Sequence, residues 1–386
     1  MNRRVCFRAD GERWQRGSGM SRRGLSKIVP AALALGLAVL APLDWRAPAA
    51  QEGTASSWSG ERLRDAQPKP LPEARAPSPP GLGPLAVPGA RAGAPARAPT
   101  VELGDALEQR LYRPLPDEEP GAEGAAEPGL APQAAGPTGA SFTQSRVFPP
   151  RALRVFPYRA IGKLFASLPG FGDFTCSAFV VERRVLATAG HCVFDFVGGR
   201  GRAARDFLFI PGFDRGRAPF GTWNGNWARP APSWRQGDGS VPSVADFGVI
   251  TVDDRQTSRG PVVLGDVVGV LGWQLQVDID QATLLGYPGN LDGAQRMQQT
   301  DAAVSDVIPP NAIEFGSAQG GGASGGPIAE DFGQPAAGQP QTANRVVSVV
   351  SFGTDGLWTL GGSVLNSEFA DLIDRACRRR AGNCAD

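Results

Sequence analysis

The stretch LATAGHCV, residues 186–193, ends an apolar run rich in β-forming residues and contains the only histidine of the chain. An imidazole titrates near neutral pH, so a histidine can transfer protons or bind a metal ion. A single histidine can equally be a structural residue without a chemical role. Which of these applies to His191 depends on the chemistry that the rest of the 386 residues offers.

The sequence on both sides of this stretch predicts an all-β domain. Runs rich in Val, Ile, Leu and Phe begin near Val147 and alternate with Gly, Pro and Asp; they include AIGKLFASL, CSAFVVERRVLATA, DFLFIPGF, DFGVITV, ATLLGYPG and RVVSVVSFG. Many short strands separated by turn residues are typical of a β-sandwich or β-barrel. The last segment, LNSEFADLIDRACRRR, repeats its apolar residues on one helical face behind a cap at Asn366 and Ser367. We therefore expect one helix to close the domain, which we assign to residues 146–386.

Residues 1–50 have the composition of an export signal. Basic residues precede an apolar run at residues 28–40, and Ala47 and Ala49 then form an A-x-A cleavage signal. The apolar run is shorter than the ~20 residues that a membrane-spanning helix needs, so we expect no stable membrane anchor. The sequence leaves open whether translation starts at Met1 or Met20 and whether export follows the Sec or the twin-arginine route. The prediction is an exported protein, secreted or periplasmic.

Residues 51–145 are dominated by Ala, Pro, Gly and scattered charges. Such a composition buries too little apolar surface to offset the entropy of the chain, so we predict a disordered pro-segment or linker. One short segment, TVELGDALEQRLYRPL at residues 100–115, carries apolar residues at near-helical spacing and could dock as a helix. An isolated helix of this length would be marginal in water.

Composition also limits the chemistry. The net charge of +1 gives no basic face for nucleic acid. One histidine and five separated cysteines form none of the spaced clusters that bind metals, so we predict neither a metal nor another cofactor. Cys6 lies ahead of the export signal, and the other four cysteines suit two disulfides in an oxidising compartment. Oxygen nucleophiles, carboxylates and one imidazole are left to carry a reaction.

A candidate oxygen nucleophile lies in GGGASGGP, residues 320–327. The glycines around Ser324 allow positive φ and a close approach of the backbone to a substrate. Successive N–H groups in such a turn can converge on an anion, as a developing oxyanion requires. A flexible glycine linker is the alternative interpretation of the same letters. A serine nucleophile also needs a base, and the base needs a group that orients it.

Two motifs together resemble a known family. TAGHC at residues 188–192 and GASGGP at residues 322–327, in that order, resemble the histidine and serine signatures of the trypsin/chymotrypsin clan of serine proteases. The closer likeness is to its bacterial secreted branch, which includes the glutamyl endopeptidases. YRAIGKLF, LLGYPGN and VVSVVSFG support the resemblance, which covers roughly residues 147–380. It implies two six-stranded antiparallel β-barrels followed by a C-terminal helix.

The resemblance also implies roles for individual residues. His191 would be the general base and Ser324 the nucleophile, and Asp246 in VADFGVITV would orient the histidine. The backbone N–H groups of Gly322 and Ser324 would form the oxyanion hole. The family pattern pairs Cys176 with Cys192 beside the catalytic histidine. The remaining cysteines, Cys377 and Cys384, would then close the C-terminal tail.

Substrate preference follows from the positions that shape the primary pocket in the family, which here are Ala318, Gln319, Ser351, Phe352 and Gly353. Trypsin-like members carry an aspartate at the pocket base, where this chain has Ala318. The glutamyl branch uses a histidine on the substrate strand, where this chain has Val350. We therefore expect cleavage after neutral, mainly apolar or small residues. Glu314 is the alternative feature, since it could reach the pocket and favour a basic residue.

These observations predict a secreted serine endopeptidase that acts on protein or peptide substrates through an acyl-enzyme and is made as a zymogen. The oligomeric state stays open. Animal members of the clan pair a new N-terminal ammonium with an aspartate just before the nucleophile, where this chain has the uncharged Ala323. We expect the oxyanion hole to form without that ion pair. The alternatives are a catalytically silent binding or adhesion module on the same fold, and an esterase.

Overall fold

The computed structural model describes residues 57–74, 93–102, 104–113, 139–258, 260–275, 279–333, 343–354 and 358–385. The predicted export segment lies outside these residues. None of the helices within the described ranges is long and apolar enough to cross a membrane.

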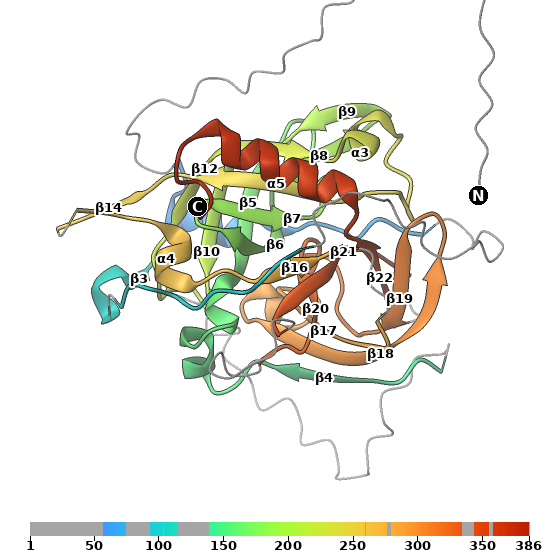
Figure 1. Ribbon diagram of the computed structural model, residues 1–386, viewed down its shortest axis with the longest axis horizontal. Helices are drawn as coiled ribbons and strands as arrows, with labels where there is room; N and C mark the ends of the chain where they lie inside the picture. The colour runs from blue at the N-terminus through green and yellow to red at the C-terminus, as the bar shows by residue number, and fades with distance from the viewer. Residues whose placement is uncertain are drawn as a thin grey trace, which may run out of the picture. The chain divides into compact units, whose positions relative to one another are not determined.

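The first barrel is a closed, six-stranded antiparallel sheet with the strand order β6-β5-β10-β12-β13-β7, in which β7 pairs back onto β6. Its strands are β5 (Ile161–Leu168), β6 (Gly172–Glu182), β7 (Val185–Thr188), β10 (Arg205–Pro211), β12 (Trp223–Pro230) and β13 (Gly248–Val252). These strands are drawn in green to yellow in Figure 1. The runs predicted from Val, Ile, Leu and Phe content supply them, since branched and aromatic side chains pack well on a pleated surface.

The second barrel has the order β21-β20-β17-β18-β19-β22 and closes through β22 and β21. Its strands are β17 (Gln281–Gly286), β18 (Gln298–Ile308), β19 (Ala312–Gly316), β20 (Pro327–Glu330), β21 (Arg345–Thr354) and β22 (Thr359–Val364). Three further strands extend this sheet: β2 (Gly93–Ala94), β4 (Phe142–Arg146) and β16 (Gly272–Gln274). The predicted fold of two six-stranded antiparallel barrels is confirmed.

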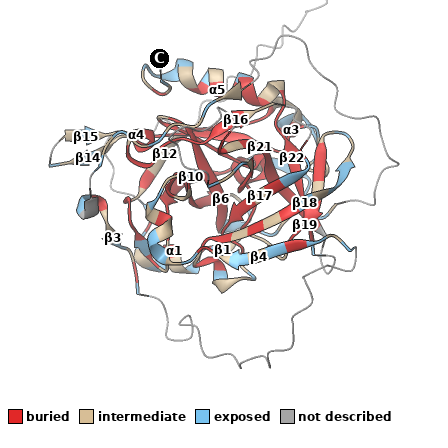
Figure 2. Cartoon of the chain, turned by 60° about the horizontal axis from the view of Figure 1, so that its bottom comes forward, coloured by how far each residue is buried: buried red, intermediate tan, exposed pale blue. Residues whose placement is uncertain are grey.

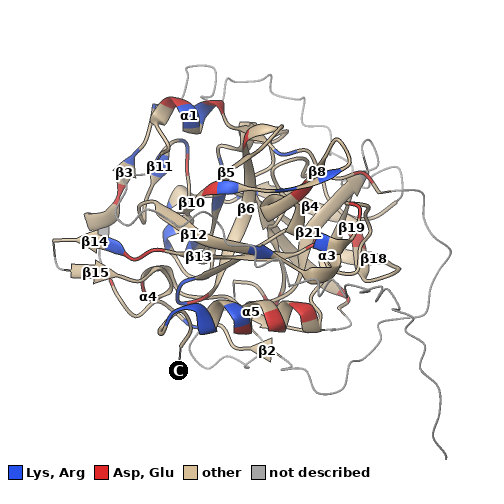
Figure 3. Ribbon diagram, turned by 90° about the horizontal axis from the view of Figure 1, so that it is seen from above, with Lys and Arg blue, Asp and Glu red and all other residues tan. Residues whose placement is uncertain are grey.

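The predicted C-terminal helix is α5, Ser367–Arg379. The side chain of Asn366 accepts a hydrogen bond from the N–H of Glu368 and so caps the first turn, as the sequence predicted. Phe369 packs edge-on against Phe247 and Trp273, which fixes the helix over β7 and β13 of the first barrel. Acidic residues lie toward the start of α5 and basic residues at its end (Figure 3). This distribution stabilises the helix through its interaction with the helix dipole.

The other described elements are short. The helices are α1 (Gly60–Asp65), α2 (Gly190–Val193), α3 (Pro232–Gln236) and α4 (Leu264–Val268). The 3-10 turns are Gly104–Leu107, Pro150–Arg154, Tyr158–Ala160 and Asp292–Ala294. The remaining strands are β1 (Gln67–Pro68), β3 (Gln109–Arg110), β8 (Phe194–Val197), β9 (Arg200–Ala203), β11 (Arg217–Ala218), β14 (Arg255–Thr257) and β15 (Gly260–Val262).

Parts of residues 51–145 differ from the disorder that their composition predicted. In the described stretches, Trp58 packs edge-on against Phe165 of β5, and Leu63 of α1 is buried in the main hydrophobic core. Figure 2 shows the barrel strands, such as β6, largely in the colour of buried residues. The described part of segment 100–115 contributes the buried Leu107 through a single 3-10 turn, where the sequence predicted a helix. The region cannot build a core of its own, but its few apolar residues add to the core that the barrels provide.

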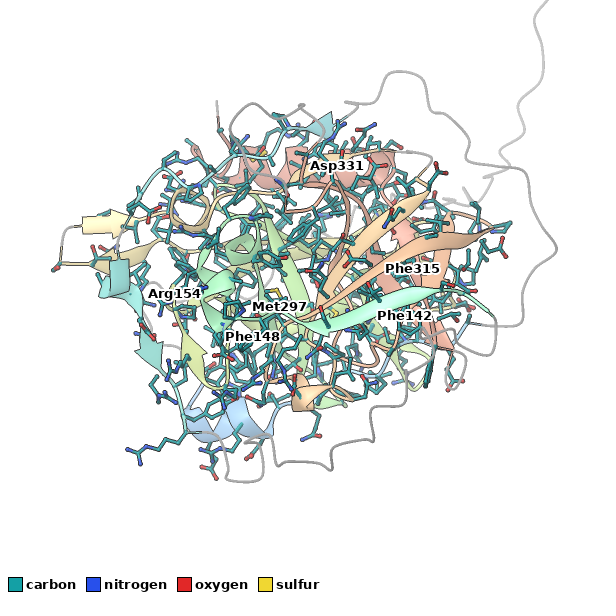
Figure 4. All side chains as sticks on the ribbon, turned by 90° about the horizontal axis from the view of Figure 1, so that it is seen from below. Phe142, Phe148, Arg154, Met297, Phe315 and Asp331 are labelled. Atoms are coloured by element: carbon teal, nitrogen blue, oxygen red, sulfur yellow. A yellow bond between two sulfur atoms is a disulfide. The ribbon has the colours of Figure 1, made fainter. Side chains whose placement is uncertain are left out.

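The second barrel gains a strand from the same region. Strand β4 begins ahead of the domain boundary that we assigned and pairs antiparallel with β18. Phe142 of β4 and Phe315 of β19, both labelled in Figure 4, belong to the buried core of this barrel. At the other end of β4, the Arg146 guanidinium forms two hydrogen bonds to the Asp292 carboxylate.

Candidate active site

Helix α2 carries the single histidine into the interior. The chain leaves β7 at Thr188, and the side chain of His191 is fully buried. Its Nδ1 lies 2.8 Å from Asp246 Oδ2, and its backbone N–H donates to Asp246 Oδ1 at 2.8 Å. A Cβ on Gly190 would lie only 2.9 Å from Asp246 Oδ1, so the glycine before the histidine is required for this close approach.

Asp246 lies two residues before the start of β13, and its carboxylate receives hydrogen bonds from both barrels. In addition to its two bonds from His191, its Oδ2 accepts from the hydroxyl of Ser351 at 2.7 Å. Its backbone N–H donates to Ser363 Oγ at 3.0 Å. A buried carboxylate is tolerated where such donors surround it. The carboxylate therefore has one orientation, and the pairing leaves His191 Nε2 as the ring atom that can accept a proton.

Ser324 lies in the turn between β19 and β20, next to the segment that leads into α2. Its carbonyl accepts from the N–H of Ser177 at 2.8 Å and lies 3.9 Å from Cys192 Sγ. Gly325 has φ of +81°, and a Cβ there would clash with Thr188 Oγ1 and Ser177 O. The glycine after the nucleophile is thus needed for both its conformation and its contact with β6 and β7.

Two side-chain atoms at this place are buried and have no hydrogen-bond partner, His191 Nε2 and Ser324 Oγ. Buried polar atoms are normally paired, because an unmade hydrogen bond costs roughly 1–3 kcal/mol. Each such atom needs an explanation, and a catalytic role is one of them. An imidazole whose other nitrogen is bound to a carboxylate, together with a buried serine hydroxyl, is the combination that acyl transfer needs.

Ser177 of β6 was not singled out in the sequence, although it shapes the turn that carries the predicted oxyanion hole. Its hydroxyl donates to the carbonyl of Gly322 at 2.9 Å and accepts from the N–H of Tyr287 at 2.9 Å. The Gly322 N–H donates in turn to the carbonyl of Lys69 at 2.8 Å. One of the two predicted oxyanion donors is therefore engaged by another segment of the same chain.

The structure contains the disulfides Cys176–Cys192 and Cys377–Cys384. Among the described residues, Cys176, His191 and Cys192 form the one group with metal-ligating atoms within 4.8 Å of one another. Both of its sulfur atoms belong to a disulfide, and a metal binds a cysteine as its thiolate. This group therefore does not fit a metal ion while the disulfide is intact.

The predicted pocket residues differ in where their side chains lie. Ala318 is partly buried against the core of the second barrel, and Gly353 forms part of strand β21. Phe352 is fully buried in the core, and the amide of Gln319 donates to Thr300 Oγ1 at 3.1 Å. The side chain of Ser351 binds Asp246, so its main contact is with the histidine–aspartate pair.

Glu314, the alternative specificity residue, lies opposite Asp306 in the pairing of β18 and β19. Burial raises the pKa of the Glu314 carboxyl above its ordinary value, and the neighbouring charge of Asp306 raises it further. Both effects disfavour the negative charge that would attract a basic substrate residue.

The turn around Ser324 also fits the letters G-x-S-x-G, which mark the nucleophile of α/β-hydrolases. In that fold the serine lies on a sharp turn from a strand to a helix. Here the turn follows β19, and the next element along the chain is the strand β20. An α/β-hydrolase esterase is therefore excluded.

No protein-family model matches the chain. The chain is 25% identical over 179 residues to a glutamyl endopeptidase of Bacillus licheniformis, which covers 45% of this chain and 50% of that protein. It is 24% identical over 160 residues to an extracellular metalloprotease of Bacillus subtilis, which covers 41% and 46%. The chain thus spans about half the length of the curated relatives that it matches.

Solved structures are also similar to this chain. They include a thermostable serine protease AL20 from an extremophilic microorganism, with 23% identity, a TM-score of 0.48, and coverage of 58% of this chain and 99% of that one. A Glu endopeptidase solved with MPD has 19% identity, a TM-score of 0.46, and coverage of 60% and 95%. The two barrels and the first curated relative confirm the resemblance to the trypsin/chymotrypsin clan and its glutamyl-endopeptidase-like branch.

Proposed function

We propose that this chain is an exported serine endopeptidase in which Ser324, His191 and Asp246 form the catalytic triad. The observation that carries the proposal is the buried His191–Asp246 pair. Its Nε2 has no hydrogen-bond partner, nor has the hydroxyl of Ser324, whose carbonyl lies 3.9 Å from the Sγ of Cys192, the residue after the histidine. The named relatives support a peptidase, since one is a glutamyl endopeptidase and the other an extracellular metalloprotease.

In the proposed mechanism, Ser324 Oγ attacks the carbonyl carbon of the scissile bond while His191 Nε2 takes the hydroxyl proton. The Asp246 carboxylate holds the Nδ1–H of the imidazole and stabilises the imidazolium that forms. The N–H groups of Gly322 and Ser324 stabilise the tetrahedral oxyanion. The proton on Nε2 then moves to the leaving amine, and the acyl-enzyme forms. Water, deprotonated by the same nitrogen, attacks the ester and releases the second product.

The proposed substrate is a protein or peptide with a neutral, mainly apolar residue before the cleaved bond. Ala318 and Val350 offer no charge to pair with a charged substrate side chain, and an unpaired charge buried there would cost several kcal/mol. A peptide library incubated with the protein should show cleavage after apolar or small residues. A strong preference for glutamate or arginine would show that the pocket has been assigned to the wrong residues.

Export to an oxidising compartment, secreted or periplasmic, is part of the proposal. Support comes from the signal-like sequence at residues 1–50, from two disulfides, and from a relative named as extracellular. The proposal does not use an N-terminal ammonium to order the oxyanion hole, because Ala323 is fully buried and uncharged.

Labelling with a fluorophosphonate tests this function directly. Mass spectrometry should find the reagent on Ser324 of the exported protein, and Ser324→Ala should lose both the label and peptide hydrolysis. A metal chelator should leave both unchanged, which separates this mechanism from the one that the name of the Bacillus subtilis relative describes. Residues 57–74 include Lys69, whose carbonyl accepts from the Gly322 N–H. If a folded protein without these residues neither labels nor cleaves any library peptide, that result would instead support the silent binding module.

A further inference from the structure

We propose that residues 67–73, here called the strap, are a built-in inhibitor that lies across the active site and competes with substrate. This inference rests on the proposed function, because it assigns substrate-binding roles to Gly322 and Gly353. The strap, QPKPLPE, connects helix α1 to a second stretch of contacts on strand β21.

The first half of the strap binds the first barrel and the predicted oxyanion hole. Strand β1 pairs parallel with β6, with Gln67 opposite Phe174 and Pro68 opposite Thr175. The N–H of Lys69 then donates to the carbonyl of Thr175 at 2.9 Å. The carbonyl of Lys69 accepts from the N–H of Gly322 at 2.8 Å, so it takes one of the two donors proposed for the oxyanion.

The side chain of Lys69 fixes this half in place. Only 3% of Lys69 is exposed, and its ammonium forms an ion pair with Asp195 Oδ2 at 2.7 Å. The same nitrogen lies 4.7 Å from the ring centre of Phe171 and 4.9 Å from that of Phe174. A lysine is rarely buried without such partners. Asp195, Phe171 and Phe174 therefore form a specific binding site for the Lys69 side chain, here called the socket.

The second half of the strap contacts Gly353, one of the predicted pocket residues. The Gly353 N–H donates to the carbonyl of Pro72 at 3.2 Å, and Glu73 forms a parallel bridge with Gly353. Leu71 packs against the same core that Ala318 contacts, and its Cδ1 lies 2.9 Å from where a Cβ on Gly353 would be. An apolar side chain thus lies against the wall that we assign to substrate recognition.

Proline at every second position suits this task. Pro68, Pro70 and Pro72 have fixed φ and no N–H, so the segment loses little entropy on docking and offers mainly carbonyl acceptors. Those acceptors match the donors of Gly322 and Gly353. Arg62 of α1 donates two hydrogen bonds to Asp173, at 2.6 and 2.9 Å, directly ahead of the strap. This tether keeps the strap at a high effective concentration beside the site.

Substrate and strap therefore need the same groups. A scissile carbonyl requires the Gly322 N–H, and a peptide seated on β21 requires Gly353 and the space beside Leu71. Because both cannot bind together, the rate of the full chain should scale with the fraction of molecules whose strap has left.

Two strap variants and one matched control test the inference in the full-length protein. Lys69→Ala removes the socket contacts, Leu71→Asp places a charge against an apolar wall, and the control Glu61→Gln changes an exposed side chain of helix α1 outside the strap. The two strap variants should accelerate fluorophosphonate labelling of Ser324 by on the order of tenfold, while the control stays within about twofold. Thermal unfolding of each protein checks that the barrels stay folded.

Amide hydrogen exchange at Gly322 and Gly353 supplies a readout that does not depend on catalysis. Both amides should be protected in the parent and in Glu61→Gln, and should exchange faster in the two strap variants. Faster exchange without faster labelling would overturn the inhibitory role. Unprotected amides in the parent, or cleavage between Lys69 and Pro70, would also overturn it. A complete lack of labelling in every variant, with faster exchange, would overturn the proposed function and leave the strap contact standing.

Discussion

The two barrels contribute to the site in different ways. The first barrel supplies His191 and Asp246, which are held by side-chain hydrogen bonds, including one from Ser351 of the second barrel. The second barrel supplies the turn around Gly322 and Ser324, which is held mainly through backbone groups. One half of the site is therefore specified by polar side chains and the other by the conformation of glycines.

This difference shows in how the polar groups are satisfied. The carboxylate of Asp246 has its hydrogen bonds within the folded barrels, whereas the Gly322 N–H uses the carbonyl of Lys69, a residue far away in sequence. The hydrogen bonds of the Asp246 carboxylate are therefore made within the two barrels, without residues 67–73. The Gly322 N–H, in the turn of the second barrel, has an acceptor only when the strap is in place or, in the proposed reaction, when a substrate is bound.

The largest expected effect comes from removing either reacting side chain. Ser324→Ala and His191→Ala should each lower turnover by about 10⁶-fold, as for residues that act as one unit. Their stabilities should differ. Ser324→Ala removes a hydroxyl without a partner, whereas His191→Ala leaves a buried carboxylate short of a donor and should cost roughly 1–3 kcal/mol. Urea unfolding measures the difference, and equal stability losses in the two variants would contradict the comparison.

The next effect separates Asp246 from its supporting serine. Asp246→Asn should lower turnover by about 10⁴-fold, because an amide favours the wrong tautomer of the histidine. Ser351→Ala removes one of several donors to the carboxylate and should cost about tenfold. Steady-state kinetics measures both. Asp254→Asn is the control, since Asp254 pairs with Arg184 and Arg380 and not with the histidine. An inactive Asp254→Asn beside an active Asp246→Asn would reassign the orienting residue.

A smaller effect is expected when the turn around Gly322 and Ser324 loses a side-chain hydrogen bond that holds it. Ser177→Ala removes the hydroxyl that holds the carbonyl of Gly322 and the N–H of Tyr287, and should lower kcat by about tenfold with little change in KM. Ser305→Ala, which removes a hydroxyl that binds the carbonyl of Glu314 away from the turn, should change neither. If Ser177→Ala raised KM alone, the serine would position substrate and not the oxyanion hole.

The smallest effect concerns the tether of the strap and depends on pH. The hydrogen bond from Arg62 lowers the pKa of Asp173, burial opposes this, and Ser167 adds to the lowering. A lowered pKa in the folded state stabilises the protein above the ordinary carboxyl pKa, and that stability is lost as pH falls through the folded value. Arg62 also lies 3.6 Å from Asp206, which shares its charge.

In a Ser324→Ala background, Asp173→Asn should therefore be less stable by about 0.2–1 kcal/mol at neutral pH, as expected for a partly exposed pair. The gap should close as the pH falls through the folded pKa of Asp173. Urea unfolding at several pH values measures it. A gap of constant size down to acid pH would show that the loss comes from packing and not from charge.

The sequence by itself determined the features that short stretches encode. The strands and the C-terminal helix with its Asn366 cap follow from local composition. The pair Cys176–Cys192 follows from the family resemblance, which leaves Cys377 and Cys384 to pair with each other. The pairing of His191 with Asp246 could be predicted for the same reason, since each residue lies beside a recognisable strand and the resemblance fixes their order.

Only the tertiary structure decided which distant groups meet. Ser351 was predicted as a pocket residue, and its hydroxyl binds Asp246, a contact between the two barrels that was not predicted. Residues 67–73 were predicted as part of a disordered region, because their own composition contains no core. The barrels supply what the strap lacks, an apolar wall for Leu71, a charged and aromatic socket for Lys69, and backbone donors for its carbonyls. Composition reports what a segment can bury by itself, and not what another part of the chain can bury for it.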